Sequence, residues 1–328
     1  MPELPEVEYT ARQLRASVIG KTIAEVSVFW ERTIGHPDLP DFRAESVGRS
    51  IEGVRRRGKF LLLDLSGNLF LSIHRRMSGN FLLLPTGWEI DTSLRETDPA
   101  LWSVKGPTFK LAEPLLEGSV GVATRSITQT QTAHCRVCFN FTDGERLLFT
   151  DPRKFGRIEL WSRTQADEAF MGLGPEPLDE TFTLTGFTEA LSRRKTVIKQ
   201  ALLAQELVVG LGNIYADEAL FYANIHPLRR ANALTQLEIQ SLHEGIIRVL
   251  TNGIEHGGTS FSNYRDMWGE AGENFNHVHV YQQDGKPCVR CATTITRIVV
   301  GQRSTHFCPT CQRLGDAVGE PITTSTQE

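Results

Sequence analysis

The chain has 328 residues, of which 40% are hydrophobic, and its 35 basic and 39 acidic side chains give a net charge of −4. This length exceeds what one typical hydrophobic core supports and predicts two or three domains. No apolar run is long enough to span a bilayer and no signal-peptide core follows the charged start, so we expect a cytoplasmic protein. The acidic balance does not by itself suggest a nucleic-acid-binding protein, since such proteins more often carry a basic surplus.

The first eight residues, MPELPEVE, carry the clearest chemical signal. If Met1 is removed, as the small proline that follows it favours, Pro2 becomes a free secondary amine. The pKa of an α-amino group is about 7.7 to 8.0, so part of it is neutral and nucleophilic at neutral pH. Glu3 and Glu6 add carboxylates suited to proton transfer after attack on a sugar C1′. The alternative is structural, with Pro5 in the first turn of a helix.

Short apolar runs separated by turn residues follow a first helix over residues 5–18, and this pattern predicts antiparallel sheet. Turn residues at 66–68 and 143–144 predict two hairpins. The expected strands are residues 60–65, 69–73, 81–84, 137–141, 146–149 and 158–161. They predict an N-terminal β-sandwich with flanking helices over residues 1–164. Residues 85–133 are too long for an ordinary connection and are expected to be an insertion, partly mobile.

The second half is predicted to be helical, which makes the fold class α+β with several domains. A glycine turn at 210–212 separates two expected helices, and Asn213 is a candidate N-cap for the second. A further helix is expected over 237–250. The Gly- and Asn-rich stretch 257–285 is typical of a long functional loop. The expected domains after the sandwich are a helical domain (165–258), this loop (259–285), a cysteine hairpin (286–313) and a tail (314–328).

Four cysteines near the C-terminus have the spacing of a zinc site. Cys288 and Cys291 form one C-x2-C pair, Cys308 and Cys311 form a second, and sixteen residues separate the two pairs. This C-x2-C, x15–20, C-x2-C spacing favours one structural zinc ion held by four thiolates on a β-hairpin. Disulfides are the alternative, but a reducing cytoplasm disfavours them. Cys135 and Cys138 have no matching pair and are expected to be ordinary thiols on opposite faces of a strand.

Basic side chains gather in a few places despite the acidic total. From Lys286 to Leu314 there are five basic residues and no acidic ones, which suggests that the hairpin faces DNA. Three other groups are candidates for phosphate binding: Arg55-Arg56-Arg57 with Lys59, Arg75-Arg76, and Arg193-Arg194-Lys195 with Lys199. A solvated charged face is the alternative for each group.

Taken together, these features resemble the bacterial formamidopyrimidine-DNA glycosylase family over nearly the whole chain. Long ungapped stretches carry the resemblance. They are Met1–Glu8, Arg57–Leu62, His74 with Met77-Ser78-Gly79, Asp151–Gly156, Leu173–Leu178, Lys195–Lys199, Val208–Asp217 and the cysteine hairpin. The resemblance implies a base-excision repair enzyme with a helix–two-turn–helix domain and a zinc finger. Such an enzyme removes 8-oxoguanine and formamidopyrimidines from double-stranded DNA and then nicks the abasic strand by β,δ-elimination.

The resemblance also assigns catalytic roles to residues of this chain. Pro2 is expected to attack C1′ and hold a Schiff base, and Glu3 to donate a proton that opens the deoxyribose. Glu6 is expected to order the terminus. Lys59 matches a lysine for phosphate contact and β-elimination, and Arg303 matches the zinc-finger arginine for phosphate binding and δ-elimination. A solvent-facing lysine and an exposed hairpin charge are the respective alternatives.

Chemistry on a base in a duplex requires the base to flip out, and the gap must be filled. Met77, Arg153 and Phe155 match the family's void-filling residues, although core packing is the alternative for Met77 and Phe155. Asn213 matches a phosphate contact. Further DNA-contact candidates are His74, His134, Lys195, Lys199 and Tyr281. The loop 259–285 corresponds to the region that closes over the flipped base, and a monomer on nucleoid DNA is expected.

Two departures from the family pattern stand out. One is the insertion at 85–133. The other is His74-Arg75-Arg76-Met77, where the usual form is His-Leu-Gly-Met. Two alternative functions are a glycosylase of the sister branch that acts on oxidised pyrimidines, and a DNA-binding protein without catalysis. The second alternative requires Met1 to remain, because a blocked terminus has no amine for a Schiff base.

Overall fold

The computed structural model describes residues 2–314, apart from 88, 92–102, 106–108, 115–119, 126–131, 133 and 261–263. Contacts divide the chain into two compact units. The first unit combines 1–182, 205–212 and 247–278, and the second combines 183–204, 213–246 and 279–328. The structure therefore groups most of the expected loop 259–285 with the N-terminal unit, and groups the cysteine hairpin with the helices.

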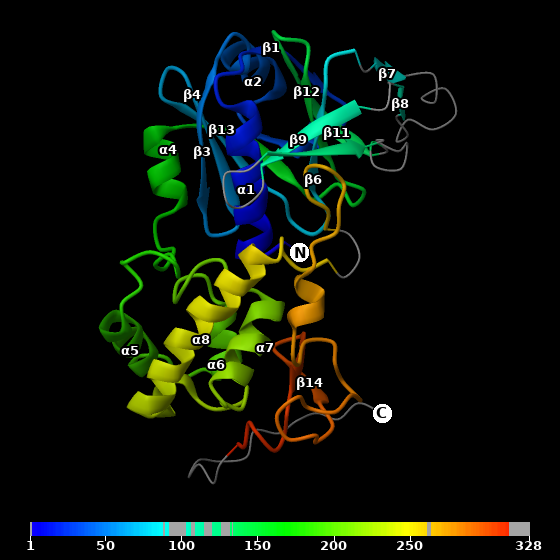
Figure 1. The fold of residues 1–328 in the computed structure, drawn as a ribbon. Coiled ribbons are helices and arrows are strands. Elements are labelled where there is room, and N and C mark those ends of the chain that lie inside the picture. Colours follow the sequence, from blue (N-terminus) through cyan, green and yellow to red (C-terminus); the bar gives the residue numbers. More distant parts are fainter. Residues whose placement is uncertain are drawn as a thin grey trace. The chain divides into compact units, whose positions relative to one another are not determined.

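Two sheets form the centre of the first unit (Figure 1). The four-stranded sheet has the order β1 (Ile23–Val28), β11 (Cys135–Phe141), β12 (Arg146–Thr150), β6 (Asn80–Leu84). The five-stranded sheet has the order β2 (Ile34–His36), β13 (Arg157–Ser162), β5 (Leu69–His74), β4 (Phe60–Leu65), β3 (Ile51–Arg57). All neighbours are antiparallel except β13 and β2. Both expected hairpins, β4–β5 and β11–β12, are confirmed.

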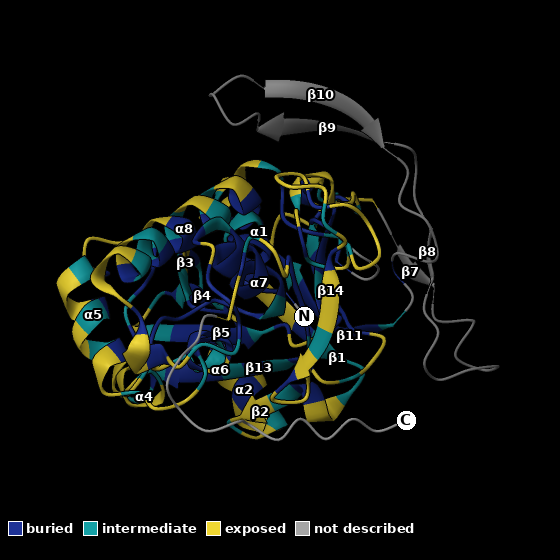
Figure 2. Ribbon diagram, turned by 90° about the horizontal axis from the view of Figure 1, so that it is seen from below, coloured by how far each residue is buried: buried dark blue, intermediate teal, exposed yellow. Residues whose placement is uncertain are grey.

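The core lies between these sheets, where alternate residues of each strand point inward. Leu61, Leu63 and Leu65 of β4 are at most 1% exposed and belong to one cluster with Phe139 of β11 and Phe149 of β12. Each such side chain stabilises the fold by about 1.5–3 kcal/mol through burial. The central strands are accordingly drawn in the buried colour in Figure 2.

Helix α1 (Leu4–Val18) contacts β3 and β4 of the five-stranded sheet. Its buried apolar residues Val7, Ala11, Leu14 and Val18 recur at three- and four-residue spacing and join the same core. Among the described residues, the unit also contains the shorter helices η1 (Glu31–Thr33), α2 (Leu39–Ser46), α4 (Arg163–Ala169) and η4 (Asn274–His277), and the last part of α8 (Gln236–Glu255). A second buried face of α1 is polar, and it becomes important for the site.

The expected insertion contains two pairs of antiparallel strands. These are β7 (Glu89–Asp91) with β8 (Ser103–Lys105), and β9 (Phe109–Pro114) with β10 (Val120–Arg125). The connections between these strands lie outside the described residues, so the prediction that the insertion is partly mobile falls on residues that are not described. The tail after Leu314 also lies outside the described residues.

The second unit contains α5 (Leu184–Ser192), α6 (Ile198–Leu203), η3 (Ala231–Ala233), α7 (Asn213–Tyr222) and the first part of α8 (Gln236–Glu255). Its hairpin pairs β14 (Thr296–Val300) with β15 (Arg303–Phe307). Gly301 and Gln302 link these strands with φ angles of 54° and 62°, as a two-residue type I′ turn requires. The α+β class and its three expected modules, sandwich, helical domain and zinc hairpin, are confirmed.

Cys135 and Cys138 do not lie on opposite faces of their strand. Both are buried in one small cluster that also contains Leu82, Leu84 and Leu148. A shift in the pairing of β11 with β12 between Cys135 and Val137 interrupts the alternation of side chains. Burial raises the pKa of the Cys138 thiol to about 12, so this pair is unreactive at neutral pH.

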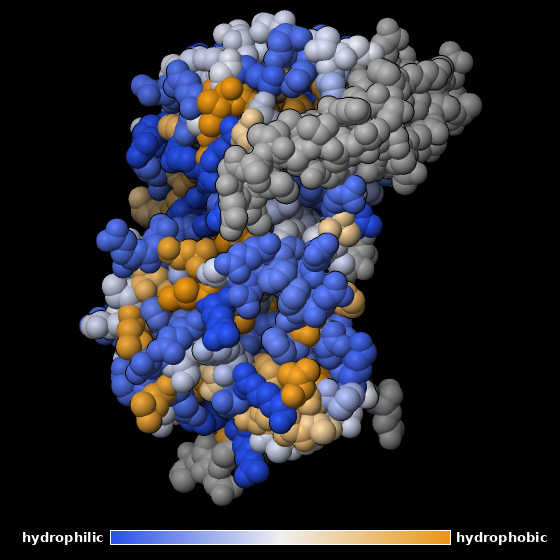
Figure 3. Space-filling model, viewed as in Figure 1, coloured by the Kyte–Doolittle hydropathy of each residue, from blue (hydrophilic) through white to orange (hydrophobic). Residues whose placement is uncertain are grey.

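The face drawn in Figure 3 is mostly hydrophilic, with hydrophobic side chains scattered in small groups. Across the part of the chain that the structure describes, every helix is too short or too polar to cross a bilayer.

Candidate active site

Residues 2–4 are held inside the first unit by hydrogen bonds. Pro2 is buried, and Glu3 is only 3% exposed. The backbone N–H of Glu3 donates to the Glu6 carboxylate at 2.7 Å, so the first turn of α1 fixes the residue next to Pro2. Leu4 N–H donates to the carbonyl of Gly210 at 3.0 Å. These bonds place the terminus against residues 210–212, the glycine turn expected from the sequence.

Two glycines make this close approach possible. A Cβ on Gly212 would lie 2.3 Å from the Glu3 carboxyl carbon, and one on Gly210 would lie 2.6 Å from the Leu4 side chain. Gly210 also has a φ angle of 87°, which other residues rarely adopt. The Glu3 carboxylate accepts a hydrogen bond from Gly212 N–H at 2.7 Å. The glycine turn is therefore shaped to receive the side chain of Glu3.

Lys59 reaches the same turn from the end of β3. Its ammonium group donates to the carbonyl of Leu211 at 2.7 Å, and the residue is only 9% exposed. The alternative of a solvent-facing lysine at a strand edge is therefore wrong. Gln205 supports the turn, since its side chain donates to the Leu211 carbonyl at 3.0 Å and accepts from Gly210 N–H at 2.9 Å. A carboxylate and an amine thus converge on three consecutive residues.

The neighbouring arginines are neutralised by carboxylates. Arg55 pairs with Asp64, while Arg56 and Arg57 both pair with Glu176, at 2.6 and 3.2 Å. Glu176 also accepts from Gly58 N–H at 2.6 Å. The expectation that 55–57 form a phosphate-binding patch is therefore not supported. These side chains instead fix the backbone that carries Lys59.

His74 lies at the end of β5, with its ring edge against Phe60 at a centroid distance of 4.7 Å. Burial lowers its pKa to about 4, and the charges of Arg76 and Lys59 act in the same direction. Its Nδ1 accepts a hydrogen bond from Arg76 N–H at 3.0 Å. His74 is therefore neutral at neutral pH, and an uncharged donor at Nε2 is what it offers to a ligand.

Two turns present the expected void-filling residues at the surface. Met77 is 42% exposed and Phe155 is 52% exposed, which rules out the alternative of core packing. The guanidinium of Arg153 lies over the Phe155 ring, 5.2 Å from its centroid. Arg76 and Lys154 have φ angles of 55° and 62°, so each turn is tight next to its exposed apolar side chain.

Asp151 ties these two turns together. One carboxylate oxygen accepts from the Ser78 hydroxyl and from Arg153 N–H, and the other accepts from Gly156 N–H at 2.7 Å. Asp151 is 1% exposed, so these bonds compete little with water. Asp151 was not predicted as a site residue, although its place at the start of the Asp-Pro-Arg-Lys-Phe-Gly stretch was a usable signal.

Glu6 joins α1 to the segment that follows α8. Its carboxylate accepts from Thr259 N–H at 2.7 Å, in addition to Glu3 N–H. Further along the same helix face, Gln13 donates to Asp266 at 2.9 Å and accepts from Met267 N–H at 3.0 Å. The expected role of Glu6 as an ordering carboxylate agrees with these contacts. The loop predicted to close over a base is thus anchored on α1.

In the second unit, α7 binds strand β15 through two polar side chains. The Asn213 amide donates to the Ser304 carbonyl at 2.7 Å, and the Asp217 carboxylate accepts from His306 N–H at 3.0 Å. Asn213 is the first residue of α7 and uses its side chain on β15, so the predicted N-cap role is wrong. This arrangement fixes the strand that begins with Arg303.

Lys199 is buried, contrary to its expected contact with DNA. Its side chain is 0% exposed, and its ammonium group lies 2.6 Å from the Asp217 carboxylate and 3.0 Å from the Asn213 carbonyl. An ammonium fully enclosed by protein partners cannot reach a phosphate. Lys199 instead holds helix α6 to helix α7. Lys195, four residues earlier, is exposed as expected.

The remaining expected contact residues occupy different environments. Arg303 is exposed at the hairpin turn. Tyr281 is half-buried, with its N–H donating to Glu218 at 2.9 Å and its ring edge against His306. His134 is half-buried beside the Asp151 turn, since its carbonyl accepts from Asp151 N–H at 3.0 Å.

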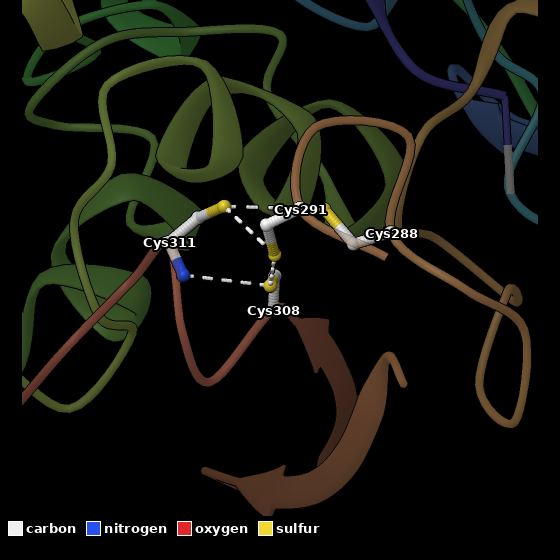
Figure 4. A group of neighbouring side chains, drawn as sticks. All are labelled: Cys288, Cys291, Cys308 and Cys311. Carbon is white, nitrogen blue, oxygen red and sulfur yellow. Dashed lines mark hydrogen bonds between the residues drawn. The ribbon is translucent and has the colours of Figure 1, made fainter. Parts of the chain in front are cut away.

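The four predicted zinc ligands converge at the base of the hairpin (Figure 4). All four sulfur atoms lie within 4.8 Å of one another, and none is in a disulfide. The sulfur separations given by the contacts are 3.4, 3.5 and 3.9 Å. Tetrahedral zinc with sulfur ligands at about 2.3 Å requires separations of about 3.8 Å, so the residues fit the metal. Four protein ligands leave no open position, so this zinc is structural.

Comparisons with known proteins match each module in turn. Residues 1–158 match the formamidopyrimidine-DNA glycosylase N-terminal domain, 173–265 match the H2TH domain of the same enzymes, and 285–314 match the zinc finger found in FPG and IleRS. The formamidopyrimidine-DNA glycosylase of Enterococcus faecalis is 40% identical over 96% of this chain and 98% of its own length. That of Herpetosiphon aurantiacus is 41% identical over 95% of this chain and 100% of its own length.

Solved structures give the same result. The Lactococcus lactis Fpg in complex with abasic-site DNA is 32% identical, with a TM-score of 0.76 over 95% of this chain and 99% of that chain. A mutant of the same protein in complex with Fapy-dG DNA is 34% identical, with a TM-score of 0.77 over 95% of this chain and 100% of that chain.

Proposed function

The chain belongs to the formamidopyrimidine-DNA glycosylase family and is a base-excision repair glycosylase, and we propose that its substrate is double-stranded DNA containing an oxidised purine. We assign the catalytic residues from one observation. Glu3 and Lys59 both contact the 210–212 turn, and Glu3 directly follows Pro2. A nucleophilic amine, a carboxyl group and a second amine are what excision through a Schiff base requires.

The reaction begins when the neutral amine of Pro2 attacks C1′ of the damaged nucleotide. The bond from C1′ to the base breaks, and the base leaves with a proton. Glu3 donates a proton to the ring oxygen, so the sugar opens and a Schiff base forms between C1′ and Pro2. Removal of a proton from C2′ then expels the 3′ phosphate, with Lys59 assisting. Loss of the 5′ phosphate in the δ step is assigned to Arg303, an exposed cation that contacts phosphate.

The damaged base must leave the stack before Pro2 can reach C1′. Met77 and Phe155 are exposed apolar side chains on tight turns, and such side chains wedge into a duplex when a base leaves. The guanidinium of Arg153 is suited to donate hydrogen bonds to the opposite base. Asp151 orders both turns, so these three residues act together.

The second unit supplies phosphate contacts through Asn213, Lys195, Tyr281 and Arg303, with zinc holding the hairpin in shape.

One lesion is engaged at a time, so the enzyme acts as a monomer on nucleoid DNA. Gel filtration with light scattering of the enzyme bound to a short duplex tests this state. A mass of one chain per duplex is expected, and two chains per duplex would contradict it.

The lesion class is tested by base release from two duplexes that differ only in one nucleotide. The first carries 8-oxoguanine opposite cytosine, and the second carries an oxidised pyrimidine opposite guanine. We expect single-turnover excision from the first to be faster by at least about tenfold, the size of effect that pocket contacts of 1–3 kcal/mol produce. Faster excision from the second would assign the chain to the sister branch. Binding without excision on either duplex would favour a non-catalytic DNA-binding protein.

A further inference from the structure

Arg75 is a buried cation in the turn between β5 and β6, two residues before Met77. It is 1% exposed and is among the largest fully buried side chains of the described protein. Burying a guanidinium group costs several kcal/mol unless its donors are satisfied. The expectation that Arg75 is part of a phosphate-binding patch is therefore wrong, because its guanidinium is enclosed by protein partners. Its hydrogen bonds explain the burial.

The Arg75 guanidinium binds three parts of the first unit at once. Its Nε donates to the carbonyl of Gly79 at 2.7 Å, which closes the turn that presents Met77. Its Nη1 donates to α1, at 2.7 Å to the Thr10 hydroxyl and 3.3 Å to the Glu6 carbonyl. Its Nη2 donates to the Asn80 amide oxygen at 2.6 Å.

The third part is the segment after α8. The guanidinium carbon of Arg75 lies over the Tyr264 ring, 5.2 Å from its centroid. The next residue, Arg265, donates its N–H at 3.3 Å to the Asn80 oxygen that also accepts from Arg75. A single side chain thus contacts the turn of Met77, the helix that starts after Glu3, and the segment expected to cover a flipped base.

Two carboxylates stabilise the charge of Arg75, because the charges of Glu6 and Asp266 both favour its charged form. Both carboxylates are buried, at 1% and 7% exposed. Burial lowers the pKa of Arg75, and the interactions with Tyr264 and Glu6 oppose this change. A neutral side chain of similar size would leave Glu6 as a less compensated buried anion.

We propose that Arg75 is a positioning residue that fixes the Met77 turn to α1 and to the Tyr264 segment, so that insertion of Met77 and capture of the flipped base occur together. This inference rests on the proposed function. It predicts a specific defect. Base excision needs the wedge and the covering segment, whereas cleavage at an existing abasic site needs only the amine chemistry of the terminus.

The test compares Arg75→Leu and Arg75→Lys with the wild-type full-length protein. Phe42→Leu serves as the matched control, because Phe42 is a fully buried core residue of α2 outside the site. Two single-turnover rates are measured for each protein, excision of 8-oxoguanine and cleavage of a preformed abasic site. A 2-aminopurine base opposite the lesion reports unstacking, and thermal melting reports stability.

For Arg75→Leu we expect excision to fall by about 10- to 100-fold, the size of loss that misplacement of a reacting group causes, while abasic-site cleavage stays within about threefold. The 2-aminopurine signal on binding is expected to fall as well. Arg75→Lys retains the charge but has one donor nitrogen in place of three, so it should show the same split with a smaller loss. If Arg75→Leu does not fold, the two rates of Arg75→Lys test the proposal.

Three results would overturn the inference. In the first, both rates fall in parallel, as expected for a residue that only stabilises the fold. In the second, excision by the Arg75 variants equals that of Phe42→Leu at the same melting temperature. In the third, excision is unchanged. A wild-type protein that excises nothing from the 8-oxoguanine duplex would instead contradict the proposed function, and the inference with it.

Discussion

The carboxylate of Glu3 accepts a hydrogen bond from the backbone N–H of Gly212 at 2.7 Å, across 209 positions of the chain. This bond joins the first residues of the protein to the glycine turn that also receives Lys59. A proton donor beside an amine nucleophile acts only if its geometry is fixed, because small displacements of reacting groups reduce rates steeply. The link between Glu3 and Gly212 supplies this fixed geometry.

Gly212→Ala tests that link directly. The added Cβ would lie 2.3 Å from the Glu3 carboxyl carbon, so the carboxyl group must move. We expect single-turnover excision to fall by about 10- to 100-fold. Gly186→Ala in α5 is the matched control, because the nearest atom to its added Cβ is the Thr183 hydroxyl at 3.1 Å. Equal excision rates in Gly212→Ala and Gly186→Ala would show that the position of Glu3 is not critical.

Lys199→Met tests the buried ion pair in the second unit. Removing the ammonium leaves the Asp217 carboxylate enclosed with less compensation, and breaking a buried pair in this way costs about 3–5 kcal/mol. We expect a lower free energy of unfolding for Lys199→Met in urea. The exposed Lys195→Met should change it by less than about 0.5 kcal/mol. Similar values for both variants would mean that the Lys199–Asp217 pair contributes little to stability.

His74 predicts a pH dependence of stability. Its folded pKa of about 4 lies below the unfolded value of about 6.5. Between these values the unfolded chain binds more protons, so the contribution is present above pH 6.5 and is lost as the pH falls towards 4. His226, whose pKa burial also lowers to about 4, acts in the same range. We expect His74→Gln to weaken the loss of stability between pH 6.5 and 4.5, measured by urea unfolding, and an unchanged profile would contradict this.

Zinc removal should affect the two units differently. The metal holds Cys288, Cys291, Cys308 and Cys311 at the base of the hairpin, and structural zinc sites supply folding energy directly. Chelation is expected to abolish DNA binding and to melt the hairpin. The sandwich has its own hydrophobic core and should remain folded. Retention of nanomolar DNA binding in metal-free protein, checked by mass spectrometry, would contradict a structural role.

Local sequence patterns predicted much of the fold. The β4–β5 hairpin followed from two short apolar runs on either side of Ser66-Gly67-Asn68, and the zinc site followed from the spacing of four cysteines. Both signals lie within a short stretch, where spacing alone fixes which side chains can meet.

Interactions between distant residues were not predictable in this way. Nothing near Arg56 and Arg57 indicates that Glu176, more than a hundred residues later, neutralises them. The burial of Lys199 depends likewise on Asp217, and that of Arg75 depends on α1 and the segment after α8. A charged residue in a sequence predicts exposure by default, and only the tertiary structure shows which charges are paired.

Borohydride trapping on a duplex with 8-oxoguanine opposite cytosine tests most directly whether the amine of Pro2 performs the chemistry, as we propose. Borohydride reduces a Schiff base to a stable bond, so the wild-type protein with Met1 removed should form a covalent adduct with the DNA. The adduct should be absent or strongly reduced in Pro2→Gly, although this variant should still bind the duplex. An adduct of equal yield in Pro2→Gly, mapped to another amine, would contradict the account.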